Sequence, residues 1–419
     1  MKILFKNARI LSMRSERIIE GELLVIDTRI AYIGENASEF APFDKVIDCN
    51  GNLLMPGFKN AHTHSAMVFL RDKGKGLSLQ DWLFKVVFPR EAKLIPSDIY
   101  HLNKVAFLEY LAGGTTACFD HYFFPPEGAK AAEEMGMRML LLAMYDEKKT
   151  PIDVLEKNYH YFNDKKDGLV RYIIGMHAEY TSNDVLIAKT KEAIDKLHSP
   201  FYTHISETKK EVDECVVRHG VTPLKYLFDQ GLFKYRGGGF HCVHLTDEEV
   251  KICQDNHINI VSCPGSNIYL SSGVAPLSKY LKSNINIALG TDGPASNEGL
   301  DMFREMRLAA TREGVIIPAF EILKMATVNA AHAMFLDEAD VLDVGKLADI
   351  IMIDLSQPNF DQTKDVIYNL VHNGSVGGVK MTMINGNILY EDGQYKLNQS
   401  VEDIYRNADE ASKRLEKDL

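Results

Sequence analysis

The sequence predicts an α/β protein with a TIM-like (β/α)8 barrel and a small composite β-sandwich domain built from both chain ends. Three observations lead to this prediction. Eight apolar, strand-like runs in the middle of the chain alternate with connections of helix length. Histidine or aspartate residues follow several of those runs. Short segments with alternating polarity and turn residues stand at both ends of the chain.

Both ends of the chain have β-strand character. Near the start, residues 22–27 form an apolar stretch between turn residues. Near the end, residues 349–354 resemble a strand, and residues 381–390 resemble a hairpin with an Asn385-Gly386 turn. Neither set has enough strands to be stable alone, so we expect one sandwich made from both.

The predicted domain boundaries follow from this pattern. Residues 1–53 and 345–395 are the two parts of the sandwich, and residues 54–344 are the barrel. Residues 396–419 are expected to form a C-terminal helix. Its apolar residues keep a helical period after Ser400, which is a suitable N-cap.

The eight expected barrel strands lie between residues 53 and 290. In such a barrel the active site lies at the carboxyl ends of the strands. The strands are expected at residues 53–61, 115–120, 139–144, 170–176, 200–204, 239–243, 258–262 and 285–290. The metal-binding or proton-handling side chains at or just after their ends are His62, His64, His177, His204, His241 and Asp292.

Composition and charge exclude several classes of protein. The 419 residues are 46% hydrophobic and 25% charged, as in a globular protein with a large core. The formal net charge of −11 disfavours a nucleic-acid or anionic-membrane partner. The apolar runs are too short for a membrane span, and the six cysteines form no CxxC pair, so we expect a cytoplasmic protein. Walker A, GxGxxG and GxSxG motifs are absent from the sequence.

Four residues are expected to bind one metal ion. His62 and His64 are two apart, so on a strand both imidazoles face the same side. His204 is the expected third nitrogen ligand, and Asp292 is the expected oxygen ligand at the mouth of the last strand. Such ligands form catalytic zinc-type sites. The alternative for Asp292 is a turn or helix-capping residue.

Glu207 and His241 are expected to handle protons. Glu207 lies three residues after His204, which suits an acid on the turn that follows a strand. The alternative is a solvated glutamate at the start of a helix. His241 lies inside an apolar run and is expected to point into the barrel, whereas His244 lies past its end and is expected to be an exposed loop residue.

Three further residues are candidates for substrate binding. Trp82 follows a glycine-containing segment at residues 74–76, which fits a mobile lid whose indole stacks on a flat substrate. The alternative for Trp82 is ordinary helix packing. Glu91 is either a partner of a substrate hydroxyl or a solvated acid. His177 is either a substrate contact or a hydrogen-bonded core histidine.

These residues lie in motifs that resemble the amidohydrolase superfamily. More narrowly, the chain is similar to the branch that holds S-adenosylhomocysteine/methylthioadenosine deaminases, guanine deaminases and triazine hydrolases. The resemblance covers almost the whole chain in the family's order. The matching segments are residues 56–64, 82–84, 89–91, 204–207, 241–245, 290–297, 300–308 and 345–349.

The resemblance implies a cofactor and roles for the residues. It implies one divalent metal ion, zinc first and iron as the alternative, held by His62, His64, His204 and Asp292. It implies that catalysis rests on Glu207, His241 and Asp292. It implies substrate contacts from Trp82, Glu91 and His177. No second metal is expected, because no lysine ends the fourth strand.

The functional hypothesis is a hydrolase that acts on C–N bonds other than peptide bonds. It deaminates a purine nucleoside of the adenosine or methylthioadenosine type, or a related heteroaromatic ring, and releases ammonia. Two alternatives are a guanine-type base deaminase and a triazine-type chlorohydrolase, and one of another class is a catalytically silent metal- or ligand-binding barrel. The expected partner is a small heteroaromatic molecule, with no nucleic acid and no membrane, and a homo-oligomer is expected from the resemblance.

Two departures from the family pattern bear on the substrate. Glu179 stands where deaminases of this branch often have proline, so an extra acid is expected near the pocket. Residues 143–150 contain no arginine, although the family binds the homocysteine carboxylate with arginines there. The alternative is that Lys148 or Lys149 takes the place of those arginines, but a lysine is a point charge and not a bidentate fork. S-adenosylhomocysteine is therefore not the expected best substrate.

Overall fold

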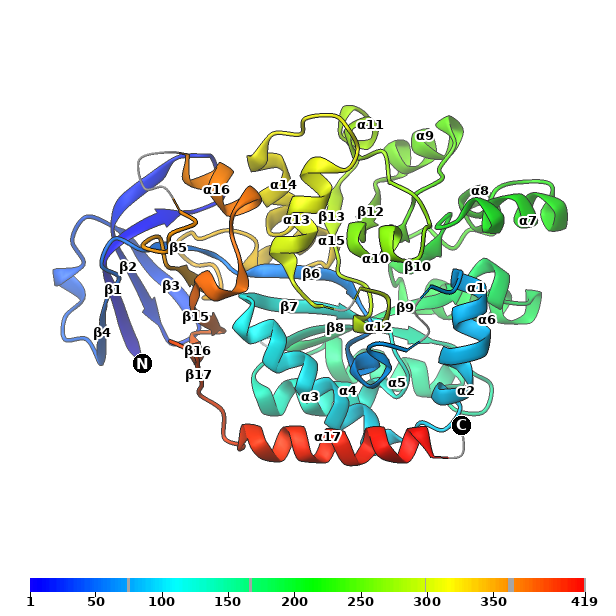
Figure 1. The fold of residues 1–419 in the computed structure, drawn as a ribbon, viewed down its shortest axis with the longest axis horizontal. Coiled ribbons are helices and arrows are strands. Elements are labelled where there is room, and N and C mark those ends of the chain that lie inside the picture. The colour runs from blue at the N-terminus through cyan, green and yellow to red at the C-terminus, as the bar shows by residue number, and fades with distance from the viewer. Residues whose placement is uncertain (74–75, 166–167, 298, 361–364, 418–419) are drawn as a thin grey trace.

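The computed structural model describes residues 1–73, 76–165, 168–297, 299–360 and 365–417. Its central part is a barrel of parallel strands surrounded by helices, and a mixed β-sheet lies at one end (Figure 1). The fold class expected from the sequence is therefore confirmed. Within the described ranges, no helix combines the length and the apolar character that a membrane span requires.

The barrel consists, in the described part of the chain, of eight parallel strands that pair in sequence order. They are β6 (Phe58–Thr63), β7 (Thr115–Asp120), β8 (Arg138–Met144), β9 (Val170–Ala178), β10 (Phe201–Ile205), β11 (Gly237–His241), β12 (Ile258–Ser262) and β13 (Ile287–Leu289). Small and large buried side chains from these strands, such as Ala61, Phe119 and Phe240, pack into one cluster. Side-chain packing of this kind makes the centre of a barrel a core and not a pore.

The mixed sheet combines strands from both ends of the chain. β5 lies between β1 and β14 and so joins the two sets. The strands are β1 (Lys2–Leu11), β2 (Ile18–Ile26), β3 (Arg29–Gly34), β4 (Lys45–Asp48), β5 (Leu53–Pro56), β14 (Ile350–Ile353), β15 (Val379–Ile384), β16 (Asn387–Glu391) and β17 (Gln394–Tyr395). Phe5, Leu54 and Met383 belong to one apolar cluster that both ends share. The domain boundaries given above stay a prediction.

One predicted strand is two strands in the structure, whereas each end of the other seven lies within two residues of the prediction. Residues 53–61 form two strands: β5 belongs to the mixed sheet, and β6 begins the barrel at Phe58. Gly57 lies between them, and a Cβ there would lie 2.1 Å from the Thr116 methyl group. Every residue of both strands is buried, so the apolar run has no periodicity that marks the change of sheet.

Helices cover the outside of the barrel (Figure 1). The α-helices are α1 (Leu79–Trp82), α2 (Phe88–Glu91), α3 (Pro96–Ala112), α4 (Pro125–Met135), α5 (Ile152–Asn163), α6 (Asp184–Leu197), α7 (Lys209–His219), α8 (Pro223–Asp229), α9 (Asp247–Asn256), α10 (Pro264–Tyr269), α11 (Leu277–Lys282), α12 (Pro294–Asn297), α13 (Met302–Thr311), α14 (Ala319–Met325), α15 (Val328–Ala333), α16 (Val366–His372) and α17 (Val401–Glu416). Tighter or wider helical turns are η1 (Ser38–Phe40), η2 (Ser65–Leu70), η3 (Leu83–Val87), η4 (Glu179–Thr181), η5 (Asp337–Ala339) and η6 (Val376–Gly378).

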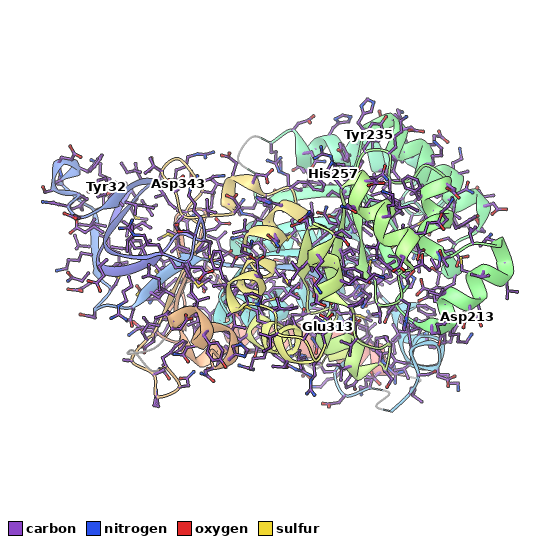
Figure 2. The ribbon with its side chains drawn as sticks, turned by 90° about the horizontal axis from the view of Figure 1, so that it is seen from above. Tyr32, Asp213, Tyr235, His257, Glu313 and Asp343 are labelled. Atoms are coloured by element: carbon purple, nitrogen blue, oxygen red, sulfur yellow. The ribbon has the colours of Figure 1, made fainter. Side chains whose placement is uncertain are left out.

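The C-terminal helix α17 lies on the outside of the barrel along α3 (Figure 1). Ser400 caps it, because its hydroxyl accepts the Asp403 N–H at 3.2 Å. Its last turn contacts α2, where Arg90 Nε lies 3.0 Å from Glu416 Oε1. Figure 2 shows Tyr32 of the mixed sheet near one end of the molecule and Asp213 of α7 near the other.

The last barrel strand meets the first one where the predicted site residues lie. The Asp292 N–H donates to the His62 carbonyl at 3.0 Å. Asn60 Nδ2 donates to Thr291 Oγ1 at 2.7 Å, and the Thr291 N–H donates to Asn60 Oδ1 at 2.9 Å. Gly290 permits this approach, because a Cβ there would lie 2.7 Å from His62 N. The closure places Asp292 beside His62.

Candidate metal centre and active site

The four predicted metal ligands come together at the carboxyl ends of three strands. His62 belongs to β6, His64 follows that strand directly, His204 belongs to β10, and Asp292 follows β13. His204 Nε2 lies 3.1 Å from His62 Nε2 and 3.3 Å from His64 Nε2. Asp292 Oδ1 lies 3.3 Å from His62 Nε2 and 3.1 Å from His64 Nε2. Ligand atoms about 2.0–2.2 Å from a tetrahedral zinc ion lie about 3.3–3.6 Å apart, so the spacing fits one cation.

The hydrogen bonds of His64 Nδ1 and His204 Nδ1 determine the tautomers of these two imidazoles, and so leave a lone pair on each Nε2 atom. His64 Nδ1 lies 2.5 Å from the His121 carbonyl, and His204 Nδ1 lies 2.8 Å from the His177 carbonyl. A carbonyl oxygen only accepts, so both Nδ1 atoms carry the proton. The two Nε2 atoms then face each other as acceptors at 3.3 Å. A cation bound between them would replace this repulsion by coordination.

Burial and neighbouring groups favour the charge state that a metal ligand needs at three of the four residues, His62, His204 and Asp292. Burial lowers the pKa of His62 to about 3, and burial with neighbouring imidazoles lowers the pKa of His204 well below its usual value. Burial alone would raise the pKa of Asp292, but the adjacent imidazoles of His62 and His64 hold that pKa well below the usual range. Burial also opposes the charged form of His64, but the neighbouring Asp292 raises the pKa of that imidazole. Neutral imidazoles and an ionised carboxylate are the forms that bind metals.

Glu207 lies on the turn after β10, as an acid beside the ligand cluster. Its Oε2 lies 3.8 Å from His241 Nε2, and its Oε1 accepts from Ser272 Oγ at 3.1 Å. The Glu211 carboxylate accepts the N–H groups of Ser206 and Glu207, both at 2.8 Å, and so fixes the turn. The Glu207 side chain is buried, and burial raises its pKa. It is therefore not a solvated helix-opening residue.

His241 and His244 lie in different places. His241 is buried at the end of β11, and its Nδ1 lies 2.8 Å from Asn267 Oδ1. Its nitrogen lies within 4.8 Å of ligand atoms of His62, His204 and Asp292. Its φ of +68° is unusual for a non-glycine residue, as strained backbone at functional sites often is.

The expectation that His244 is an exposed loop residue is wrong. His244 is half-buried and bonds the Ser272 carbonyl at 2.8 Å. It lines a cavity together with residues 76–80 and Thr208, and none of the four predicted metal ligands lines that cavity.

A cavity of about 490 Å³ opens onto the ligand cluster. Trp82, Glu91 and His177 all line it, together with Glu207 and His241. Its size is within the range of small-molecule sites. Residues 74–75 of the expected lid lie outside the described residues.

The three candidate substrate contacts also have partners within the protein. Trp82 Nε1 donates to the Lys73 carbonyl at 3.2 Å. Glu91 accepts from the Tyr122 hydroxyl at 2.7 Å, and burial raises its pKa. His177 Nδ1 bonds Thr181 Oγ1 at 2.9 Å, and burial lowers its pKa to about 4. Glu91 is thus a buried acid and not a solvated one. The roles of all three toward substrate stay predictions.

Glu179 does not stand in the cavity, which corrects the expectation of an extra acid near the pocket. It is buried and pairs with Arg218 Nη2 and His219 Nε2, the former at 2.5 Å and the latter at 2.8 Å. Both partners belong to α7. A period-2 pattern gives the side of a residue on a strand, but Glu179 begins η4, where that pattern ends.

Sequence reasoning missed one histidine of the site. His121 follows β7, lines the cavity, and stacks on His204 with ring centroids 4.9 Å apart. Its Nδ1 is buried without a hydrogen-bond partner among the described residues. The predicted strand at residues 115–120 ends one residue before it, so the rule that found the other histidines also applies to His121.

Comparisons with known proteins agree with this geometry. The family model described as Amidohydrolase family matches residues 53–389. The chain is 36% identical to a 5-methylthioadenosine/S-adenosylhomocysteine deaminase from Caldanaerobacter subterraneus subsp. tengcongensis, with 99% of each chain covered. It is 35% identical to a 5'-deoxyadenosine deaminase from Methanosarcina acetivorans, with 93% of each covered. A crystal structure of an adenosine deaminase from Xanthomonas campestris with bound zinc matches with a TM-score of 0.91 and 28% identity, covering 99% of this chain and 98% of that one. The chain therefore belongs to the amidohydrolase family.

Proposed function

We propose that this chain removes the exocyclic amino group of an adenosine-type purine nucleoside by hydrolysis and releases ammonia. The relatives from Caldanaerobacter and Methanosarcina, which match over 93% or more of both chains, carry names of nucleoside deaminases. One observation carries the proposal. Glu207 is a buried acid that lines the same cavity as three of the four metal-type ligands, His64, His204 and Asp292, and it lies beside His241. A closed structural metal site needs no such acid.

His62, His64, His204 and Asp292 would hold one divalent cation. Zinc is the proposed ion, because three imidazoles and a carboxylate suit it and because the Xanthomonas structure holds zinc; iron is the alternative. When bound, such a cation would lower the pKa of its water from that of bulk water to about 7.

The residues of the cavity can then move the protons of a deamination. Asp292 accepts a proton from the attacking water, and Glu207 donates one to the ring nitrogen next to the amino-bearing carbon. His241 hydrogen-bonds the new oxygen. Asp292 passes its proton to the departing amino group, and Glu207 recovers one from the new hydroxyl as the carbonyl forms. Protons and charges balance, and ammonia leaves. General acid–base help of this kind contributes about 10²–10⁴-fold to the rate.

The cavity supports a nucleoside with an uncharged 5' substituent as substrate. Trp82 and neighbouring apolar residues offer a face for the ring, and Glu91 offers an acceptor for a ribose hydroxyl. Among the described lining residues Lys149 is the one lysine or arginine, and it is exposed beside Asp146. A carboxylate tail therefore meets no bidentate cation. We propose 5'-deoxyadenosine or methylthioadenosine as better substrates than S-adenosylhomocysteine.

The test is ammonia release by wild type and by Glu207→Gln. The variant keeps the size and the hydrogen bond to Ser272 but cannot donate a proton. We expect kcat to fall about 10²–10⁴-fold while one equivalent of metal stays bound. Glu127→Gln, at the rim of the same cavity, is the matched control and should keep most of the activity. Full activity of Glu207→Gln would contradict the proposed role.

A substrate panel separates the remaining candidates. It contains adenosine, 5'-deoxyadenosine, methylthioadenosine, S-adenosylhomocysteine, guanine and a chlorinated triazine. Ammonia from the adenosine-type nucleosides supports the proposal. Turnover of guanine or chloride release from the triazine would replace it by one of the alternatives, and no turnover of any ring by metal-replete protein would favour a catalytically silent barrel.

Association into a homo-oligomer and a cytoplasmic location are further proposals from the family resemblance. Light scattering of the purified protein tests the first, and cell fractionation tests the second. Neither bears on the chemistry above, because all proposed site residues belong to one chain.

A further inference from the structure

We propose that residues 266–272, which comprise most of α10 and the turn after it, position all three proton-handling side chains of the site. This segment carries Ser266, Asn267 and Ser272, and each bonds a different one of Asp292, His241 and Glu207. The inference rests on the proposed function, and it goes further by identifying residues that act through the catalytic ones.

The three contacts are short and specific. Ser266 Oγ donates to Asp292 Oδ2 at 2.6 Å. His241 Nδ1 lies 2.8 Å from Asn267 Oδ1. Ser272 Oγ donates to Glu207 Oε1 at 3.1 Å.

Each contact selects one orientation of its partner. Because Ser266, together with Ser296 of α12 at 2.6 Å, holds Asp292 Oδ2, the other oxygen, Oδ1, is the one that faces His62 and His64. Because Asn267 Oδ1 accepts the Nδ1 proton of His241, the Nε2 atom of that ring is left to face Glu207. A hydroxyl on one oxygen of Glu207 likewise leaves Oε2 directed toward His241.

None of the three lines the cavity of about 490 Å³, and all three are buried. They therefore do not touch the substrate proposed for that cavity. The buried Asn267 Nδ2 atom has no hydrogen-bond partner among the described residues, and a buried polar group without a partner lowers stability. This free-energy cost argues against a purely structural role for Asn267. The favourable part of the arrangement is the bond to His241.

A second layer holds the segment itself in place. The buried Glu305 of α13 accepts the Gly265 N–H at 2.8 Å and an Asn297 Nδ2 hydrogen at 2.7 Å. Asn297 Nδ2 also donates to the Thr291 carbonyl at 2.7 Å. A Cβ on Gly265 would lie 2.2 Å from Asn297 Oδ1, so the backbone approaches as closely as glycine allows. The start of α10 and the loop of Asp292 are thus tied to the same carboxylate.

The turn after α10 is fixed to the helix. The Ser272 N–H donates to the Asn267 carbonyl at 2.8 Å, so Ser272 and Asn267 move as one unit. A shift of this unit would misplace His241 and Glu207 together. Partners of this kind typically change metal affinity or activity 10–100-fold when removed.

The first experiment is a double-mutant cycle between Ser272→Ala and Glu207→Gln. In wild type, Ser272→Ala should lower kcat about 10–100-fold with KM within about twofold. In the Glu207→Gln background the same change should have no further effect on the residual rate, since Ser272 acts through Glu207. Equal losses in both backgrounds, or no loss in either, would overturn the inference. Ser283→Ala, a partly buried serine bonded to the Lys279 carbonyl, is the control.

The second experiment measures metal and folding, which do not depend on the substrate. Ser266→Ala should weaken zinc binding about 10–100-fold in competition with a chelating dye, whereas Asn267→Ala and Ser272→Ala should not. Ser266→Thr keeps the hydroxyl and should restore the affinity. If wild type itself releases no ammonia, the proposed function fails while the zinc result still stands. If wild type is active and the three variants match it in rate and zinc affinity, the positioning role alone fails.

Discussion

The two ends of the barrel both bury ionisable side chains, but they differ in how those side chains are paired. At the carboxyl end, three imidazoles and the Asp292 carboxylate surround one point beside a cavity. At the amino end, Lys59 of β6, Arg138 of β8 and Asp349 before β14 are fully or almost fully buried where the barrel meets the mixed sheet.

At the amino end the charges have conventional partners. Arg138 donates to both oxygens of Asp349, at 2.6 and 2.9 Å. Lys59 Nζ donates to the Gly57 carbonyl at 2.9 Å and to Thr116 Oγ1 at 3.2 Å. None of these residues lines the cavity of about 490 Å³. The group connects the barrel to the mixed sheet.

At the carboxyl end, the Nε2 acceptor atoms of His64 and His204 have no hydrogen-bond donor between them. His64 and His204 use their Nδ1 protons on carbonyl groups and turn acceptor atoms toward each other. The difference teaches that burial of charge does not by itself mark a functional site. Convergence of acceptors beside an open cavity does.

Removal of a ligand should give the largest effect and would break the comparison if it failed. His204→Ala takes away the central nitrogen of the cluster, and we expect loss of the bound ion and at least about a 10³-fold loss of ammonia release. Elemental analysis and the ammonia assay check it. Lys59→Met, at the opposite end, is the control and should retain one equivalent of metal. A His204→Ala protein with full metal content would show that another ligand set, such as one with His241, holds the ion.

The carboxyl end was largely predictable from the sequence, for a physical reason. A strand ends at a recognisable change from apolar to polar residues, and the ends of parallel barrel strands lie together. His62, His204 and Asp292 each stand at such an end, so separate local patterns predicted that they would lie together. The expectation for Glu179, which came from the family resemblance, failed because the direction of its side chain depends on Arg218, which lies 39 residues away.

No local sequence pattern predicts the contacts in the rest of the site or at the amino end of the barrel. Asn267 and Ser272 are ordinary polar residues in sequence, and their roles depend on His241 and Glu207 from other segments. Asp349 lies 211 residues from Arg138 along the chain. Such pairs arise only when the tertiary structure brings them together.

Loss of one partner at the amino end should lower stability but not catalysis. Arg138→Met leaves Asp349 buried without its counter-charge, so we expect the protein to be about 3–5 kcal/mol less stable. The kcat of the folded enzyme should stay near that of wild type, which urea unfolding and the ammonia assay check.

The double variant Arg138→Met/Asp349→Asn is the control for the amino-end pair. It removes both charges while keeping an acceptor for the Asn385 N–H, so it should recover part of the lost stability. A fall in kcat with unchanged stability would place Arg138 in the functional machinery and remove the distinction between the two ends.

The smallest expected effect is the pH dependence of stability that arises from Lys59. It tests whether burial lowers the pKa of a charged group at the amino end. Burial lowers the pKa of Lys59 from 10.5 to about 8. The folded state therefore binds this proton less tightly than the unfolded chain. The contribution of Lys59 to stability is fully present above pH 10.5 and is lost as the pH falls through about 8. Over the full range the difference is about 3 kcal/mol.

Lys59→Met removes this proton but also removes two hydrogen bonds, so the sign of its effect at one pH is not predicted. The pH dependence is predicted. The free energy of unfolding of wild type, minus that of Lys59→Met, should increase between pH 7 and pH 10, which urea unfolding at both values measures. A constant difference would mean that Lys59 is solvated or paired well enough to keep its ordinary pKa. Burial of the Lys59 ammonium group would then cost no more free energy than its exposure at the surface.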